Sequence, residues 1–136
     1  MHICRSLIRF KRTQFFLYAL KLRNASVPKV FQKVVQRHPE KVMLHCGEEA
    51  WTFRRVDEFS NRVANYFISQ GFQKGDEVAL FMENRPEYVA IWLGLAKAGL
   101  VSALINTNQR LNSLVHSLTV VKTKAVIFSS EMSQRE

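Results

Sequence analysis

Three short apolar runs in the second half of the chain begin 23–24 residues apart, and each is rich in residues that favour β-strands. They span residues 77–82, 100–105 and 124–128. Between them, apolar side chains recur at helical spacing, first over 84–99 and then over 110–121. Strand, crossover helix and strand, repeated twice, predicts a parallel sheet. Because the three runs are apolar almost throughout, we expect a sheet that is covered on both faces.

The first crossover helix has its own boundary signals. Asn84, with Glu87 three residues later, is typical of a reciprocal capping box at a helix start. Gly99 is a typical helix end. The side chains that we expect to point inward from this helix are Val89, Trp92, Leu93 and Ala96.

The segment before the three runs predicts a helix that begins after Ser26. Ser26 is a suitable helix cap, and Pro28 is tolerated in a first turn. The pair His38-Pro39 predicts the end of this helix.

A hairpin and a second helix follow. Alternating apolar residues predict two short strands over 41–46 and 49–53, with the turn at Gly47. Apolar residues three and four apart then predict a helix over about 54–70 that ends at Gly71. This helix and the two crossover helices can cover much of a three-stranded sheet, but both sheet edges need partners. The chain ends about eight residues after the third strand. We therefore expect residues 25–136 to form an incomplete α/β domain.

Residues 1–24 form a basic leader, with six basic side chains and no acidic one, whereas the remaining residues carry 14 basic and 11 acidic side chains. The high isoelectric point thus comes mainly from the leader and is poor support for nucleic-acid binding. The aromatic residues of the rest of the chain lie at spacings typical of a core and do not alternate with basic residues. We expect no nucleic-acid partner.

The leader is amphipathic in its first half, where Arg5, Arg9 and Arg12 share a face. Its longest apolar run, residues 15–20, is too short to span a bilayer. Basic residues attract anionic lipid surfaces, which favours a leader that lies on a membrane. Two alternatives remain open: a mitochondrial transit peptide, which is also Arg-rich and free of acids, and an incorrectly assigned start of the reading frame.

Familiar catalytic and cofactor patterns are absent from the sequence. It has no Gly-rich phosphate loop, and its two cysteines and four histidines lack metal-ligand spacing. We assign no catalytic, cofactor-binding or metal-binding residue. In parallel sheets, ligands gather beyond the carboxyl ends of the strands. The candidate positions there are Glu83-Asn84-Arg85, the loop Asn106-Thr107-Asn108-Gln109-Arg110, and Ser129-Ser130. The polar loop 106–110 is the best of these, with turn closure and helix capping as the alternative role for its side chains.

Five segments, in this order, resemble the opening motifs of the adenylate-forming enzymes, the superfamily of acyl-CoA synthetases, luciferases and adenylation domains. They are residues 51–64, 71–79, 83–88, 92–99 and 104–110. The last segment, Leu-Ile-Asn-Thr-Asn-Gln-Arg, together with Met82-Glu-Asn-Arg and Trp92-Leu-Gly-Leu-Ala-Lys, resembles the fatty acid transport proteins, which are very-long-chain acyl-CoA synthetases.

The resemblance implies that residues 25–136 are the first part of the large N-terminal AMP-binding domain of a long-chain fatty acid–CoA ligase. It implies ATP, Mg²⁺ and coenzyme A as cofactors of the whole enzyme, and a long-chain fatty acid, a membrane surface and the rest of the same domain as partners. The expected location is the cytosolic face of the endoplasmic reticulum or plasma membrane, with mitochondria as the alternative. The family's phosphate loop, ribose-binding acid and C-terminal lysine have no counterpart here. We therefore expect an inactive chain without bound cofactor, or alternatively a non-catalytic short form that pairs with a full-length synthetase.

Overall fold

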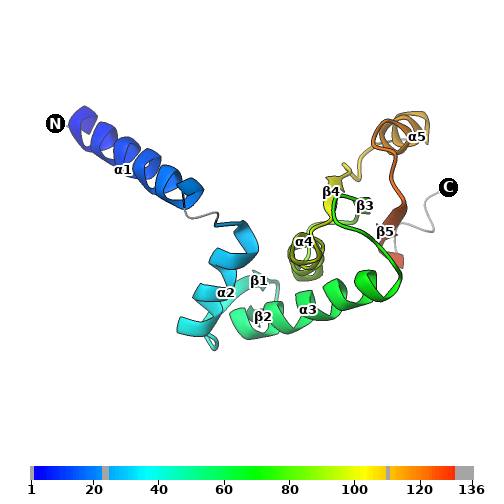
Figure 1. The fold of residues 1–136 in the computed structure, drawn as a ribbon, viewed down its shortest axis with the longest axis horizontal. Helices are drawn as coiled ribbons and strands as arrows, with labels where there is room; N and C mark the ends of the chain where they lie inside the picture. The colour runs from blue at the N-terminus through cyan, green and yellow to red at the C-terminus, as the bar shows by residue number, and fades with distance from the viewer. Residues whose placement is uncertain (1, 23–24, 110, 131–136) are drawn as a thin grey trace.

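The structure, a computed structural model, describes residues 2–22, 25–109 and 111–130. Its elements are shown in Figure 1. In chain order they are α1 (His2–Leu22), α2 (Val27–Arg37), β1 (Val42–Cys46), β2 (Glu49–Thr52), α3 (Phe53–Ser69), β3 (Glu77–Phe81), α4 (Pro86–Ala98), β4 (Val101–Leu104), α5 (Leu111–Val120) and β5 (Ala125–Phe128).

The leader forms the helix α1, which stands apart from the rest of the chain in Figure 1. Several of its apolar side chains are exposed, among them Phe10, Phe15 and Tyr18. None of the helices in the described ranges combines the length and hydropathy required to cross a bilayer. The division of the chain into a leader and a partial domain stays a prediction.

The helix α2 has the predicted bounds, since it starts after Ser26, carries Pro28 in its first turn and ends before His38. The Ser26 side chain makes no capping hydrogen bond, so Pro28 and the packing of the helix set its start. Phe31 is the buried residue of α2, and its ring lies 6.1 Å from that of Phe53. One side of α2 is thus fixed to the body of the molecule.

The strands β1 and β2 form the predicted antiparallel hairpin, and Gly47 takes a positive φ of 57° in its turn. The second strand is one residue shorter than predicted because Thr52 already caps the next helix. Its Oγ1 accepts a hydrogen bond from Arg55 N at 3.2 Å, so β2 passes into α3 without a loop.

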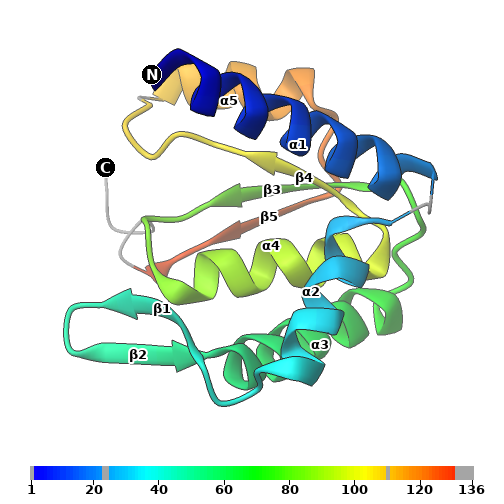
Figure 2. The same ribbon diagram turned by 90° about the vertical axis from the view of Figure 1, so that its left-hand side faces the viewer.

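The last three strands form a parallel sheet in the order β4-β3-β5, as predicted. Its register pairs Leu80 with Leu104 on one side and with Ile127 on the other. Figures 1 and 2 show α4 and α5 on opposite faces of this sheet, which is the arrangement of a doubly wound α/β fold. The middle strand is the most deeply buried, with Val78, Ala79 and Leu80 fully inaccessible.

The expectation that the sheet is covered on both faces is wrong for the outer strands. Val101 and Leu104 of β4 and Val126 and Phe128 of β5 are exposed. Two causes act together. Among the described residues α5 packs on its face of the sheet less closely than α4 does, and β4 and β5 each have a strand neighbour on one side alone.

The predicted capping box of the first crossover helix is also wrong. Arg85, not Asn84, is the cap residue, and it makes no side-chain capping bond, because Pro86 with its fixed φ begins the helix. Glu87 instead pairs with Arg85, at 3.1 Å between Oε2 and Nε. The other end is as predicted, with Gly99 in the left-handed conformation at φ 78°.

The helix α4 is buried on more sides than one amphipathic face allows, because it lies between α3 and the sheet. Of the four side chains predicted to point inward, Leu93 is buried and the other three are half-buried. Gly94 marks the closest approach to α3. A Cβ atom there would lie 2.7 Å from both the Ser60 carbonyl oxygen and the Val63 Cβ. A glycine is therefore required for these two helices to pack at this distance.

Candidate functional site

A hollow of about 510 Å³ lies beyond the ends of β3 and β4. Figure 2 shows these two strand ends on its left side. The carboxyl ends of parallel strands meet at one edge, so residues that follow the two strands come together there. The lining residues are Met82, Glu83, Asn84, Tyr88, Leu104, Ile105, Asn106, Thr107 and Asn108.

The hollow has an apolar floor and a polar rim. Met82 and Ile105 are buried directly after their strands. Ile105 N donates to the Leu80 carbonyl at 3.0 Å, which extends the ladder by one residue and fixes the start of the loop. Tyr88 reaches the hollow from the first turn of α4. Strand ends and a helix start, both rigid elements, thus position these side chains.

The loop after β4 holds its own shape through Asn106. The Oδ1 atom of Asn106 accepts a hydrogen bond from Asn108 N at 2.9 Å, and its carbonyl accepts one from Gln109 N at 3.2 Å. Gln109 Oε1 in turn accepts from Ser117 Oγ of α5 at 3.0 Å. Part of this polar loop therefore has the turn-closing role that the sequence left open. Thr107 and Asn108 still line the hollow.

The hollow is lined by one phenol, one carboxylate, and amide and hydroxyl groups. Burial raises the pKa of the Tyr88 phenol above its usual range, so this group is neutral at physiological pH and can both donate and accept hydrogen bonds. No set of three or more His, Cys, Asp or Glu residues in the described part of the chain is arranged to hold a metal ion. Amide and hydroxyl groups predominate in this rim, and such groups orient a polar ligand. The assignment of no catalytic residue stays a prediction.

Two of the three predicted candidate segments meet at this site. Glu83 and Asn84 come together with residues 106–108, whereas the third segment, Ser129-Ser130, does not line the hollow. Ser129 is buried, and its hydroxyl has no hydrogen-bond partner within the described residues. Arg110 lies outside the described residues.

Arg85 does not line this hollow but a smaller one of about 180 Å³ beside the hairpin. There it lies with His45 and Cys46 of β1 and with Val89 of α4. His45 is exposed, and Cys46 is an exposed free thiol.

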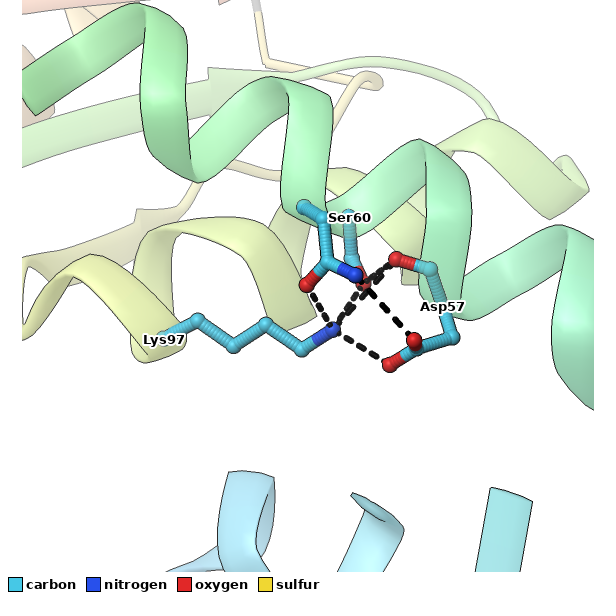
Figure 3. Close-up of polar contacts among 4 residues, drawn as sticks. Asp57, Ser60 and Lys97 are labelled. Atoms are coloured by element: carbon cyan, nitrogen blue, oxygen red, sulfur yellow. Dashed lines mark hydrogen bonds and ion pairs between the residues drawn. The ribbon is translucent and has the colours of Figure 1, made fainter. Parts of the chain in front are cut away.

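The sequence analysis missed a cluster of polar side chains around Lys97, drawn in Figure 3. Lys97 Nζ donates to Asp57 Oδ1 at 2.6 Å, to Ser60 Oγ at 2.7 Å and to Asn61 Oδ1 at 2.7 Å. The Ser60 hydroxyl donates to the Asp57 carbonyl at 2.8 Å, and Asn61 Nδ2 donates to Asp57 Oδ2 at 3.1 Å. The three donors of the ammonium group are thus all used.

This Lys97 cluster joins α4 to α3. The Lys97 side chain is only 7% exposed, and its Nζ also lies 5.5 Å from the Phe31 ring of α2. The sequence carried a signal: Asp57, Ser60 and Asn61 have helical spacing, and Lys97 is a charge in a mainly apolar helix. Which lysine meets which carboxylate is decided by tertiary packing, so the pairing could not be read from spacing.

Solved structures of adenylating enzymes share this fold. The N-terminal subdomain of Klebsiella oxytoca NpsA, solved with 3-hydroxyanthranilyl-AMSN, superposes with a TM-score of 0.74 at 27% identity, over 79% of this chain and 28% of that one. The anthranilate CoA ligase AuaEII, solved with anthranoyl-AMP, gives a TM-score of 0.74 at 23% identity over 78% of this chain and 20% of its own, which supports the fold alone.

Curated relatives are closer in sequence. Long-chain fatty acid transport protein 1 of Homo sapiens is 50% identical over 109 residues, or 79% of this chain and 17% of that protein. A medium/long-chain-fatty-acid–CoA ligase of Mycobacterium marinum, whose name also includes 3-oxocholest-4-en-26-oate, is 46% identical over 72 residues, or 53% of this chain and 13% of its own length. The chain thus spans about 17% of the human relative that it matches.

The family model described as "AMP-binding enzyme" matches residues 31–136, well over half of the chain. The parallel sheet, its helices on both faces and the order of the five sequence motifs agree with this match. The chain therefore belongs to the AMP-binding enzyme family, and its structure corresponds to part of the N-terminal subdomain of adenylate-forming enzymes.

Proposed function

We propose that this chain is the N-terminal part of an enzyme that activates long-chain fatty acids as coenzyme A thioesters. The identity of 50% with human long-chain fatty acid transport protein 1 is the observation that carries the proposal. The fatty acid–CoA ligase of Mycobacterium marinum supports the same substrate class.

The proposed reaction has two steps. The fatty carboxylate attacks the α-phosphate of ATP, which forms an acyl-adenylate and releases pyrophosphate. The thiolate of coenzyme A then attacks the acyl carbon and releases AMP. Catalysis of such a phosphoryl transfer depends on positioning and on stabilising developing charge, with Mg²⁺ as the usual counter-ion. In the proposal, these roles belong to residues outside the described part of the chain.

In the proposal, the hollow beyond β3 and β4 helps to position a ligand. It lies where ligands bind in doubly wound sheets, and it presents the neutral phenol of Tyr88 with the side chains of Thr107 and Asn108.

A chimera tests the ligase assignment. The aligned segment of human long-chain fatty acid transport protein 1 is replaced by the corresponding residues of this chain, and palmitoyl-CoA formation is measured with ATP and coenzyme A. We expect thioester formation with palmitate and none with acetate. A folded chimera that forms no palmitoyl-CoA contradicts the proposal.

Two tyrosine variants of the chimera test the role of the hollow. Tyr88→Phe removes one hydroxyl from the hollow, and Tyr66→Phe removes one from the exposed side of α3. Loss of one hydrogen bond to a ligand corresponds to a decrease of roughly 2- to 10-fold in kcat/KM. We expect this decrease for Tyr88→Phe and no change for Tyr66→Phe. Equal kcat/KM values for the two variants would contradict a role of the hollow in ligand positioning.

The chain alone, in the proposal, is inactive. Incubated with ATP, palmitate and coenzyme A, it should give no more thioester than a blank without protein. Activity above the blank would contradict the assignment of the catalytic groups to other sequence.

A non-catalytic short form is the second candidate function. The exposed apolar side chains of β5, Val126 and Phe128, favour it, because an open strand edge can pair with another chain. Co-purification with a full-length synthetase, lost on Val126→Lys, would support this function. A monomer that captures no synthetase would contradict it.

Membrane association is part of the proposal, since the relatives are named as transport proteins of long-chain fatty acids. We place the chain at the cytosolic face of the endoplasmic reticulum or plasma membrane, with mitochondria as the alternative. Fractionation with organelle markers separates these locations, and recovery in the fraction without membranes would contradict both.

A further inference from the structure

The net positive charge of the chain is confined to its beginning. The first 39 residues carry nine basic side chains and no acidic one, whereas the rest of the chain carries eleven of each. The whole formal charge of +9 therefore belongs to residues 1–39, which include α2 as well as the leader. The nine residues are Arg5, Arg9, Lys11, Arg12, Lys21, Arg23, Lys29, Lys33 and Arg37.

The outer side of α2 carries a basic stripe, which we define as Lys29, Lys33 and Arg37. These residues recur every four positions, so they lie on one side of the helix, and all three are exposed. In the described parts of the chain, no ion pair is found for Lys33 or Arg37. The opposite side of α2 buries Phe31 in a cluster with Trp51 and Val56. The stripe is therefore a fixed feature of the domain surface.

The helix α1 supplies apolar surface next to this charge. Phe15, Phe16, Leu17 and Tyr18 are consecutive and all exposed, Phe15 to 75%. Successive residues of a helix are rotated by about 100°, so four of them cover its whole circumference. Only four residues separate Leu22 from Val27, and an extended link of this length spans at most about 18 Å. A surface that holds α1 is thus within reach of the stripe.

We propose that residues 2–39 dock the protein onto an anionic lipid surface, with the aromatic residues of α1 in the headgroup–acyl boundary and the stripe of α2 against lipid phosphates. The proposal deepens the membrane association stated above and rests on it. Exposed aromatic and apolar side chains gain by leaving water for this boundary, and neighbouring basic side chains are attracted to anionic headgroups. A nucleic acid would neutralise the charge but would leave the apolar circumference of α1 in water, so lipid is the better match.

The proposal also fixes the orientation of the domain. Figure 1 shows α2 on the opposite side of α4 from the parallel sheet. When the stripe faces lipid, β5 and α5 therefore face away from it, and the open sheet margin stays accessible from the solvent.

Vesicle binding by the whole chain tests the docking surface. Co-sedimentation is measured with vesicles of phosphatidylserine and phosphatidylcholine and with vesicles of phosphatidylcholine alone. We expect binding to the anionic vesicles that weakens as salt increases. The double variant Lys33→Glu/Arg37→Glu should weaken it by roughly 10-fold or more. Phe15→Ser/Phe16→Ser should weaken binding to a similar degree without changing the fluorescence of the two tryptophans, Trp51 and Trp92.

The matched control is Lys74→Glu/Lys122→Glu, which makes the same change in net charge at two exposed lysines outside the segment. It should bind within about twofold of the parent chain, because the reversed charges lie outside the proposed contact surface. Equal losses in both double variants would mean that net charge alone acts, and would overturn the proposal. Absence of anionic vesicle binding, or tighter binding to duplex DNA than to vesicles, would overturn it as well.

The palmitoyl-CoA assay of the chimera in detergent micelles separates this proposal from the proposed function. A whole chain that binds no anionic vesicles, together with an active chimera, refutes the docking surface and leaves the ligase assignment intact. Vesicle binding by the whole chain that depends on the stripe, together with a folded but inactive chimera, supports the docking surface and contradicts the ligase assignment.

Discussion

The covered core between α4 and β3 differs sharply from the open margin formed by β5 and β4, although all three strands are apolar and belong to one sheet. Leu80 in the middle strand is fully buried, and its register partner Leu104 in β4 is 53% exposed. Phe128, at the end of β5, is 56% exposed. An apolar strand sequence therefore indicates what a strand is suited to bury, and its neighbours decide whether burial occurs.

Truncating the two paired leucines should give the largest difference between these regions. Leu80→Ala removes a fully buried side chain and should lower the free energy of unfolding by about 2–5 kcal/mol. Leu104→Ala, the matched control, should cost less than ~1 kcal/mol, because the side chain is already half in water. Urea unfolding followed by tryptophan fluorescence measures both. Equal losses would show that the margin is covered in solution.

Two lysines offer a second matched comparison, since each pairs with an aspartate at 2.6 Å. Lys97 is 7% exposed in the core, whereas Lys124, the residue before β5, is 58% exposed and pairs with Asp76. Lys97→Met leaves three oxygen acceptors without their donor and should cost roughly 2–3 kcal/mol. Lys124→Met should lie within ~1 kcal/mol of the parent. The same unfolding assay would contradict this reasoning if the two losses were alike.

A smaller effect is expected where α3 and α4 are closest. In an exposed helix, Gly→Ala stabilises by roughly 0.5–1 kcal/mol. At Gly94 the added methyl group meets Ser60 and Val63, and overpacking should instead destabilise by about 1–2 kcal/mol. In the Val63→Ala background, Gly94→Ala should lower the free energy of unfolding by less than it does in the parent chain. A double-mutant cycle measures this difference. A more stable Gly94→Ala chain would show that the helices separate easily.

The smallest effect on stability is expected for the ion pair between Asp76 and Lys124, the residue before β5. The hydrogen-bonded ion pair with Lys124 and the hydrogen bond from Gln73 N lower the pKa of Asp76 below its ordinary value of 3.8. A lowered pKa means that the stabilisation is present above pH 4 and is lost as the pH falls through the pKa of the folded state. We expect Asp76→Asn to flatten this acid limb of the stability curve. Unfolding curves at several acidic pH values measure it, and an unchanged limb would contradict the role of this pair.

The sequence was sufficient for the order of the elements, because periodicity and chain stops are local. Gly47 and Gly99 occupy the predicted turn and helix end, and the parallel pairing of the three strands follows from their crossover helices. The carboxyl edge of β3 and β4 was predicted as the site on the same topological ground. These features depend on neighbours along the chain or on general rules of connection.

The remaining features depend on contacts between distant residues. The start of α4 at Pro86 overrode the cap predicted at Asn84, because a rigid φ competes with a side-chain hydrogen bond. The Lys97 cluster joins residues that are 36–40 positions apart, and no spacing rule relates them. The exposure of β5 likewise depends on which elements lie beside it.

The direct passage of β2 into α3 at Thr52 sets a limit on how this part of the chain can change in length. No spacer residue lies between the last hairpin residue and the first helical turn. One inserted residue would therefore turn every later side chain of α3 by about 100° about the helix axis. Val56 and Ser60 would leave α4, and the match between the two helices would be lost together with the Lys97 contacts. The junction therefore fixes which side chains of α3 face α4. We expect natural insertions and deletions to fall in the loops around it.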